Sequence, residues 1–427
     1  IISMIRYCIK GPNKDAKGII NIEGAKNSCL ALMASTVLID GTVTLKNVPI
    51  VEDIITMCKL LNALGSSVKI SKRNKTLIIN NSRTNKCIVP YQLISTMRGG
   101  CLLMGSLLGK NQNKKIKVAQ GGGCALGNRE INFHLSGFKA LGANINLSKG
   151  YVNLSTKKGL IGNKYKFPKV TVTGTSNLIM AAVKAKGLTK LYNVSREPEV
   201  VDLVNFLNQS GANIKFKGQR KIHIQGVKKL YGEHYKIIPD RIEAFSYLCV
   251  GAITRGSVKV KNINPNFLKS EIKILKKIGY TLKIQNSTIG ISTKKKLKAV
   301  QINTGPWPKF ATDNMPPLLA VLTLIPGISR IKENVFGAHR FQCVPELKRM
   351  GAKIEIIGNQ AKVYGSKSLS SAECMSSDLR TTFSIILGLI MAEGDGYVSR
   401  VYHASRGYFD LLNKLKKLGI NIKSQSV

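Results

Sequence analysis

One phrase recurs six times along the 427-residue chain, and it constrains the fold more than any other feature. Each copy predicts an amphipathic helix, then a glycine, then a strand. Glycine suits the left-handed conformation that commonly ends a helix. The copies are about 70 residues apart, so six units fill the chain. Their glycines are Gly65, Gly142, Gly211, Gly279, Gly351 and Gly419.

The strand expected after each glycine has apolar residues two positions apart. The third residue after the glycine is aliphatic in every copy: Val68, Ile145, Ile214, Leu282, Ile354 and Ile422. The fifth is apolar in five of six copies: Ile70, Leu147, Phe216, Ile284 and Ile356, with Ser424 as the exception. This alternation predicts strands with one buried face.

A second phrase lies between the copies. Residues 41–48, 187–194 and 256–263 read as strands that open with glycine and close near an asparagine. Helices of small and apolar residues precede them, for example at 177–185 and 244–254. Strands and helices therefore alternate, which is typical of an α/β protein. At this length two domains are expected, and the six units divide into two sets of three.

The charge balance is extreme, with 66 Lys and Arg against 22 Asp and Glu, a formal net charge of +44. Such a field attracts anions, so nucleic acid must be considered as a partner. The lysines are spread over every segment, however, and aromatic residues for stacking on bases make up only 6%. We therefore favour compositional drift on solvated faces and anionic small-molecule substrates, with no nucleic-acid partner.

Several other classes of protein are not expected. The longest apolar runs, 29–39 and 383–391, are shorter than the ~18 to 20 residues that span a bilayer. The first residues lack the apolar core of a secretion signal, so no membrane association and a cytoplasmic location are predicted. The nine cysteines include no CxxC pair and the five histidines no HxxxH spacing. Neither a disulfide framework, a metal site nor a cofactor is expected.

The stretch from Gly121 to Glu130 is the first candidate for chemistry. Its three consecutive glycines disfavour helix and strand and predict a loop. That loop carries the thiol of Cys124 and the guanidinium of Arg129, a proton donor or nucleophile beside an anion clamp. The alternative from these residues alone is a surface turn with an incidental cysteine.

Other polar residues stand at expected helix starts and loops. Lys26, in Gly24–Asn27, lies where free amides and the helix dipole favour an anion, although an exposed lysine is the commoner outcome. Asp313 follows a proline-rich approach that can hold a carboxylate as a base. Arg98 lies among small and apolar residues, where an arginine is either partnered or functional. The pairs Asp240/Glu243 and Asp378/Arg380 read as structural caps of two helices.

Taken together, these motifs resemble the enolpyruvyl transferase family, in particular the members that act on UDP-N-acetylglucosamine. The matching stretches run end to end: GAKN at 24–27, TMR at 96–98, GGCALGNR at 122–129, REPEVVD at 196–202, PDRIE at 239–243, TD at 312–313, VPEL at 344–347, SDLR at 377–380 and SRGY at 405–408. The resemblance implies two inside-out α/β barrel-like domains of three repeated units each. It implies a first domain at 21–238 and a second at 239–427, to which residues 1–20 contribute a strand.

The resemblance also implies an activity, the first committed step of peptidoglycan biosynthesis. Phosphoenolpyruvate gives its enolpyruvyl group to the sugar 3-hydroxyl through a tetrahedral adduct, and phosphate leaves. Cys124 is implied as the general acid that protonates the methylene carbon, and as the target of electrophiles such as fosfomycin. Asp313 is implied to take the hydroxyl proton, with Lys26 and Arg406 completing the catalytic set.

The implied substrate contacts form two sets. Those for phosphoenolpyruvate are Lys26, Asn27, Arg129, Arg340 and Arg406. Those for the nucleotide sugar are Arg98, Arg129, Glu130, Ile131, Asn132, Phe133, Lys169, Val170, Thr171, Val172, Asp313 and Val335. Three features depart from the family pattern: Asn132 and Ser405 replace a usual aspartate, and the loop 336–341 is one residue longer.

Two alternative functions stay open. The sister transferase that acts on shikimate 3-phosphate shares the six-unit plan, but it lacks the loop cysteine and the GAKN opening, so Cys124 and Lys26 discriminate. An RNA-binding or RNA 3'-phosphate-cyclising protein built on a similar unit would account for the net charge of +44. That function predicts a clustered basic groove and a steep dependence of RNA affinity on salt.

Overall fold

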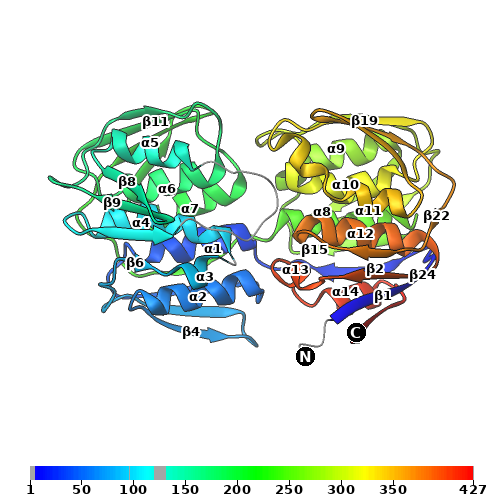
Figure 1. The fold of residues 1–427 in the computed structure, drawn as a ribbon, viewed down its shortest axis with the longest axis horizontal. Coiled ribbons are helices and arrows are strands. Elements are labelled where there is room, and N and C mark those ends of the chain that lie inside the picture. Colours follow the sequence, from blue (N-terminus) through cyan, green and yellow to red (C-terminus); the bar gives the residue numbers. More distant parts are fainter. Residues whose placement is uncertain (1–4, 96, 120–130, 427) are drawn as a thin grey trace. The chain divides into compact units, whose positions relative to one another are not determined.

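The structure is a computed structural model, and it describes residues 5–95, 97–119 and 131–426, with only the backbone of Arg98 (Figure 1). The chain forms two compact units. The N-terminal unit comprises the described residues from Gly24 to Ile238, and the C-terminal unit those up to Glu23 and from Pro239 onward. Each unit is described by itself below.

The N-terminal unit alternates helices and strands. Its helices are α1 (Lys26–Thr36), α2 (Glu52–Ala63), α3 (Tyr91–Ile94), η1 (Arg98–Leu102, a 3-10 helix), α4 (Leu103–Lys110), α5 (Asn132–Ala140), α6 (Val172–Ala182) and α7 (Pro198–Gln209). Its strands are β3 (Thr42–Lys46), β4 (Ser67–Ser71), β5 (Thr76–Asn80), β6 (Ile88–Val89), β7 (Ile116–Ala119), β8 (Asn144–Ser148), β9 (Tyr151–Ser155), β10 (Lys164–Lys166), β11 (Leu188–Tyr192), β12 (Asn213–Phe216), β13 (Lys221–Gln225) and β14 (His234–Lys236).

The C-terminal unit repeats this alternation. Its helices are α8 (Arg241–Ile253), η2 (Pro265–Leu268), α9 (Lys269–Ile278), η3 (Thr312–Asn314), α10 (Met315–Leu322), η4 (Gly337–Phe341), α11 (Val344–Arg349), α12 (Leu379–Met391), α13 (Tyr402–Ser405) and α14 (Leu411–Lys417). Its strands are β1 (Ile5–Gly11), β2 (Lys17–Asn21), β15 (Ser257–Lys261), β16 (Tyr280–Gln285), β17 (Thr288–Thr293), β18 (Gln301–Asn303), β19 (Ile328–Lys332), β20 (Lys353–Ile357), β21 (Gln360–Tyr364), β22 (Leu369–Ser370), β23 (Glu373–Met375), β24 (Ala392–Ser399) and β25 (Ile422–Ser426).

Within the described residues, each unit holds three sheets of one design. The orders are β14-β3-β5-β4, β6-β7-β9-β8 and β10-β11-β13-β12 in the N-terminal unit, and β2-β15-β17-β16, β18-β19-β21-β20 and β22-β24-β1-β25 in the C-terminal unit, where β23 also pairs with β24. In every sheet an edge strand pairs in parallel with the next. An antiparallel hairpin completes the other side in five sheets, and in the sixth the antiparallel strands β1 and β25 come from the two ends of the chain. The six predicted units are therefore six sheets with their helices.

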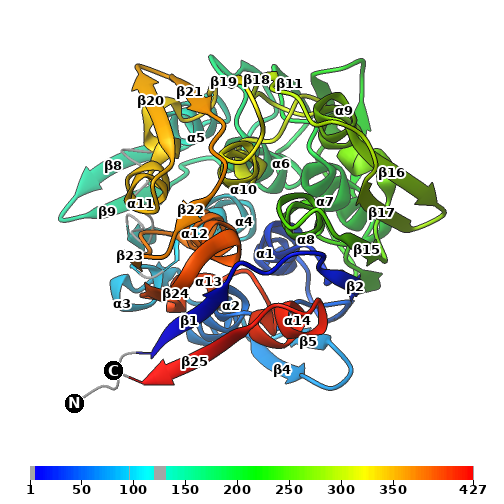
Figure 2. The same cartoon turned by 90° about the vertical axis from the view of Figure 1, so that its right-hand side faces the viewer.

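The buried layer of the C-terminal unit is made of helices. All residues of α8 and α10 are buried, as are all but one of α12. These three helices contact one another. Figure 2 shows them in the middle of the unit, with its sheets outside. Helices α1, α4 and α6 are the corresponding buried helices of the N-terminal unit. The predicted inside-out α/β architecture is confirmed.

The glycines and asparagines of the repeated phrases have the backbone role that the sequence predicts. All six repeat glycines have positive φ, between 83° at Gly419 and 119° at Gly279. Asn47, Asn193 and Asn262 also have positive φ, from 57° to 60°. Each donates its side-chain amide to the carbonyl that follows the parallel edge strand, as Asn262 does to Ile22 at 2.9 Å. A short side chain that tolerates this conformation explains the choice of asparagine.

The prediction of one buried face is wrong for three of the strands that follow the glycines. The third residue is buried or half-buried in all six strands. Of the five apolar residues at the fifth position, three are exposed, by 51% at Leu147, 41% at Ile284 and 39% at Ile356. These residues lie on β8, β16 and β20, which are edge strands of their sheets. Residues near the tip of an edge hairpin therefore reach beyond the helices that bury the sheet.

The chain passes between the units at two adjacent places. Glu23 accepts a backbone hydrogen bond from Asp240 at 2.8 Å, within the C-terminal unit. Ile238 accepts one from Ala25 at 2.7 Å, within the N-terminal unit. Strand β1 pairs with β24 and β25, while β2 pairs with β15. The N-terminal residues thereby complete two sheets of the C-terminal unit.

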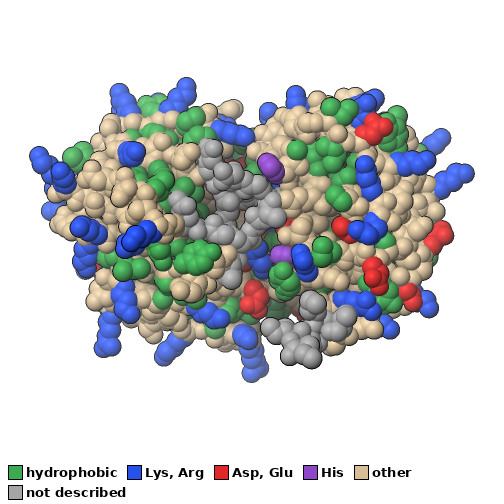
Figure 3. Space-filling view, in the orientation of Figure 1, with side chains coloured by type: hydrophobic (Ala, Val, Ile, Leu, Met, Phe, Trp, Pro, Cys, Tyr) green, Lys and Arg blue, Asp and Glu red, His purple; other side chains and the backbone are tan. Residues whose placement is uncertain are grey.

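Three further findings bear on the classes considered above. Among the described residues, no helix is long and apolar enough to cross a membrane, and no group of three His, Cys, Asp or Glu could hold a metal. The eight described cysteines are all free, and seven are buried. Lys and Arg side chains are spread over the visible surfaces of both units (Figure 3).

Candidate active site

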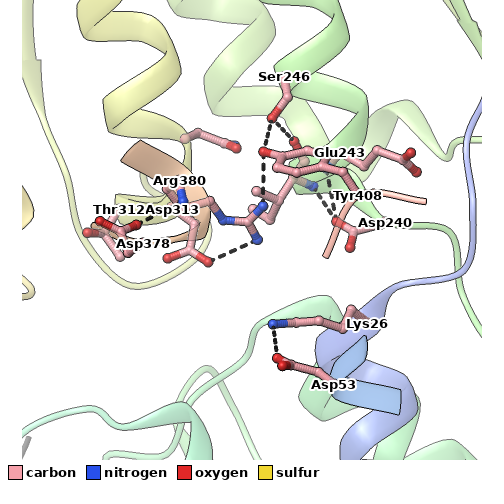
Figure 4. A network of polar contacts seen from close by, with 12 residues as sticks. Lys26, Asp53, Asp240, Glu243, Ser246, Thr312, Asp313, Asp378, Arg380 and Tyr408 are labelled. Atoms are coloured by element: carbon pink, nitrogen blue, oxygen red, sulfur yellow. Dashed lines mark hydrogen bonds and ion pairs between the residues drawn. The ribbon is translucent and has the colours of Figure 1, made fainter. Parts of the chain in front are cut away.

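Asp313 lies in η3, directly before the buried helix α10, and both of its carboxylate oxygens meet an arginine. Figure 4 shows the contact with Arg380. Arg340 Nη2 is 2.6 Å from Oδ1, and Arg380 Nη2 is 3.3 Å from Oδ2. The Asp313 side chain keeps 28% of its surface exposed. These two bonds orient the carboxylate, and part of its surface remains accessible.

Arg380 is fixed by the start of helix α12. Asp378 caps this helix, accepting from the backbone N–H of Arg380 at 2.8 Å and of Thr381 at 3.1 Å. Arg380 also donates to the hydroxyl of Tyr408 at 3.1 Å, and that hydroxyl lies 2.8 Å from Ser246 Oγ. Burial raises the pKa of Tyr408, which keeps the phenol neutral. The guanidinium therefore reaches Asp313 from a buried position that the capped helix start and Tyr408 hold in place.

Arg340 comes from η4 and is one of the largest fully buried side chains, at 2% exposure. Its Nε donates to Thr312 Oγ1 at 3.0 Å, and its guanidinium lies 4.7 Å from the centre of the Phe336 ring. The residue predicted to clamp phosphoenolpyruvate is therefore held on Asp313 and Thr312 in this structure.

Glu333 organises the neighbouring turn although it is entirely buried. It accepts from Thr312 Oγ1 at 3.1 Å and from the backbone N–H groups of Val335 at 2.8 Å and Phe336 at 2.9 Å. Val335, a predicted contact of the nucleotide sugar, is thereby linked through Glu333 to Thr312, which directly precedes Asp313 in the sequence.

Lys26 is the first residue of α1, as its motif predicts, and it forms a largely buried ion pair (Figure 4). Its Nζ is 3.0 Å from Asp53 Oδ2, and the two side chains are 12% and 5% exposed. Asp53 lies in the first turn of α2. Helix α1 begins without a capping side chain or an acidic residue in its first turn. Asn27, the next residue, is exposed.

Two predicted nucleotide-sugar stretches meet through a histidine. Asn132 and Phe133 open α5, after Ile131, while Lys169, Val170, Thr171 and Val172 lead into α6. His134 Nε2 lies 3.3 Å from Thr173 Oγ1, and His134 Nδ1 lies 2.8 Å from Asn177 Nδ2. Thr171 caps α6 by accepting from Gly174 N at 3.2 Å. His134 therefore joins two segments that are more than 30 residues apart in the sequence.

The remaining predicted residues are described in part. Cys124, Arg129 and Glu130 lie outside the described residues. Arg98 begins η1, which leads into α4. Arg406 directly follows α13 and is half-buried.

The described thiols differ from what a general acid requires. Burial raises the pKa of Cys58 to about 11 and that of Cys343 to about 12. Burial also raises the pKa of Cys29 and Cys249. Thiols in such surroundings stay protonated and are poorly reactive. Within the described part of the chain, these four cysteines therefore serve as small core residues.

Comparison with known proteins adds a family to this geometry. The family model described as EPSP synthase (3-phosphoshikimate 1-carboxyvinyltransferase) matches residues 10–415. The UDP-N-acetylglucosamine 1-carboxyvinyltransferase of Pelagibacter ubique is 44% identical over 407 residues, covering 95% of this chain and 96% of that protein. The protein of the same name from Endomicrobium trichonymphae is 42% identical over 420 residues, covering 98% and 99%.

Solved structures share the fold at lower identity. The enolpyruvyl transferase NikO from Streptomyces tendae superposes with a TM-score of 0.89 at 21% identity, covering 100% of both chains. EPSP synthase from Acinetobacter baumannii superposes with a TM-score of 0.76 at 20% identity, covering 99% of this chain and 100% of that one.

Proposed function

This chain belongs to the EPSP synthase family, and we propose that it transfers the enolpyruvyl group of phosphoenolpyruvate to the 3-hydroxyl of UDP-N-acetylglucosamine. The observation that carries the proposal is the full-length similarity to proteins named for that acceptor. The reaction opens peptidoglycan synthesis, and we place it in the cytoplasm. The enzyme is thereby a transferase needed for the cell wall, and so for cell shape and division.

The described residues support this chemistry in two ways. Asp313 is an oriented, partly exposed carboxylate, which suits a base for the sugar hydroxyl. Lys26 is a cation at the uncapped start of a buried helix, where backbone N–H groups and the helix dipole favour an anion. The proposed phosphoenolpyruvate set is completed by Asn27, Arg129, Arg340 and Arg406.

In the proposed mechanism, Asp313 takes the proton of the 3-hydroxyl as its oxygen bonds to C2 of phosphoenolpyruvate. Cys124 gives a proton to the methylene carbon C3, which yields the tetrahedral adduct. The C2–O bond to phosphate then breaks and phosphate leaves with the electron pair, taking up the proton held by Asp313. C3 returns a proton to the Cys124 thiolate, which restores the double bond and the thiol. Atoms and charge balance without a metal or a redox partner.

Cys124 is tested by substitution and by labelling. Cys124→Ser is expected to slow turnover by roughly 10²- to 10⁴-fold, the range for a lost general acid. Fosfomycin is expected to add its mass to the peptide that contains Cys124 and to leave the eight described cysteines unmodified. Seven of these are buried, and desolvation raises the pKa of the eighth, Cys87. Unchanged turnover of the serine variant would remove Cys124 from the mechanism.

The acceptor is tested by phosphate release from phosphoenolpyruvate with two candidate acceptors. We expect release that depends on UDP-N-acetylglucosamine and none with shikimate 3-phosphate. Release with shikimate 3-phosphate alone would assign the chain to the sister activity. Release with neither acceptor would refute the proposed function.

A further inference from the structure

One buried carboxylate in the N-terminal unit accepts hydrogen bonds from three residues. Asp202 lies on α7 and is 1% exposed. Its Oδ2 accepts from the hydroxyl of Ser28 on α1 and from the backbone N–H of Ile238 at 3.4 Å. Its Oδ1 accepts from the hydroxyl of Tyr235 on β14 at 2.6 Å.

These donors are all neutral. Within the described residues, no Lys or Arg forms an ion pair with Asp202. Burial raises its pKa, and the bonds from Ser28 and Tyr235 oppose that rise. Burying a carboxylate without a cation costs free energy. Stability of the fold alone therefore does not explain a charged side chain at this position.

The contacts of Asp202 close a ring around the first turn of α1. Ala25, just before Lys26, donates its backbone N–H to Ile238 O at 2.7 Å. Ser28, two residues after Lys26, donates to Asp202, which also holds the N–H of Ile238. Ala25 and Ser28, which flank Lys26 and Asn27, are thus hydrogen-bonded to Ile238 and Asp202, respectively. Because α1 has no capping side chain of its own, this ring fixes where its first turn lies.

We propose that Asp202 is a positioning residue for phosphoenolpyruvate, acting through Ser28 to hold Lys26 and Asn27 in place for the anion. Asp202 itself is buried and does not touch the substrate. This inference rests on the proposed function, since it assumes that Lys26 and Asn27 bind phosphoenolpyruvate.

The test compares kinetics of the full chain with three variants, Ser28→Ala, Tyr235→Phe and Asp202→Asn. Each loss of a hydrogen bond is expected to raise the KM for phosphoenolpyruvate about 3- to 10-fold. The KM for UDP-N-acetylglucosamine is expected to change less than about 2-fold, because its proposed contacts come from other segments of the chain. The double variant Ser28→Ala/Tyr235→Phe is expected to raise the KM by less than the product of the single effects, since both donors act on one carboxylate.

A matched control separates positioning from general destabilisation. Ser66 is also a buried serine of the N-terminal unit, and it donates to Asn81 at 2.8 Å, not to Asp202. Ser66→Ala is expected to leave both KM values unchanged. If Asp202→Asn fails to fold, Tyr235→Phe, which removes one oxygen atom, still decides the question.

Two outcomes would overturn the inference. One is an unchanged KM for phosphoenolpyruvate in folded Ser28→Ala and Tyr235→Phe. The other is an equal rise in both KM values, or the same rise in Ser66→Ala. Failure of the proposed function is distinguishable, because the parent chain would then release no phosphate with UDP-N-acetylglucosamine.

Discussion

The two units share one fold but begin their buried helices in opposite ways. In the C-terminal unit, Asp240 caps α8 and Asp378 caps α12, and Asp313 stands just before α10. In the N-terminal unit, α1 and η1 begin without a capping side chain or an acidic residue in the first turn, and with Lys26 and Arg98 instead.

Equivalent helices in the two units therefore differ in the chemistry of their N-termini. Helix N-termini expose unpaired N–H groups and a partial positive charge. In the C-terminal unit carboxylates cap α8 and α12, and Asp313, just before α10, is held by two arginines. In the N-terminal unit α1 begins without such a carboxylate, and under the proposed function its start receives the anion. Of its other buried helices, α6 is capped by the neutral Thr171.

Asp313→Asn replaces the carboxylate that stands just before α10 in the C-terminal unit, and it has the largest expected effect. The amide keeps the shape but cannot take a proton, so kcat is expected to fall by roughly 10²- to 10⁴-fold. Binding of UDP-N-acetylglucosamine, measured by calorimetry, is expected to persist. Asp395→Asn on β24 is the control and should keep full activity. A kcat for Asp313→Asn within a factor of two of the parent would contradict the assignment.

Lys26→Gln removes the positive charge at the start of α1 in the N-terminal unit. The amide can still donate to Asp53, but the positive charge is lost, so affinity for phosphoenolpyruvate is expected to fall about 10- to 100-fold. Titration of phosphoenolpyruvate in the presence of the nucleotide sugar measures this. The control is Lys110→Gln, because Lys110 also forms an ion pair in this unit, with Asp40 at 2.8 Å. Equal losses in both variants would mean that net charge, and not the site, binds the anion.

Asp378→Ala and Thr171→Ala compare how much a helix cap contributes to stability in each unit. Asp378 accepts from two backbone N–H groups and from Thr381 Oγ1 at 2.5 Å, whereas Thr171 accepts from one N–H group. Urea unfolding is expected to show a loss of about 1 to 2 kcal/mol for Asp378→Ala and a smaller one for Thr171→Ala. A larger loss for Thr171→Ala would show that the C-terminal unit depends less on its caps than proposed.

Glu243→Gln tests the acidic first turn of α8 through pH and has the smallest expected effect. Burial raises the pKa of Glu243 to about 7, against an opposing contribution from Lys414 at 2.7 Å. The folded chain then keeps a proton that the unfolded chain releases above about pH 4.5. The contribution of Glu243 to stability is therefore greatest at low pH and falls as the pH rises towards 7.

The glutamine variant lacks this titration. The free energy of unfolding of the parent minus that of Glu243→Gln is expected to decrease by on the order of 1 kcal/mol between pH 5 and pH 7.5. Urea unfolding of both chains at four pH values measures it. A difference that rises with pH would mean that Lys414 keeps Glu243 ionised throughout.

Local signals in the sequence predicted the parts of the molecule that depend on local physics. The repeat glycines, the asparagines that close strands, and the caps Asp240 and Asp378 all follow from backbone conformation or helix ends, which neighbouring residues determine. Lys26 at the start of α1 belongs to the same class.

Contacts between distant segments could not be read from the sequence. Asp53 as the partner of Lys26, and His134 as the link between α5 and α6, are set by how helices pack. The burial of Arg340 against Asp313 likewise depends on η4 folding onto η3. The exposure of Leu147, Ile284 and Ile356 also depends on how far the helices extend under each edge hairpin, which local alternation does not encode. The resemblance to a family named candidates but not these partners.

The most direct test of the account follows a carbon label. Phosphoenolpyruvate labelled with ¹³C at C2 and C3 is incubated with the chain and UDP-N-acetylglucosamine, and the products are examined by NMR while phosphate is measured in parallel. The account predicts that both labels move into an enolpyruvyl ether on the sugar 3-oxygen, in equal amount to the phosphate released. Phosphate release with the label recovered as free pyruvate, or labelled phosphoenolpyruvate left unchanged, would contradict it.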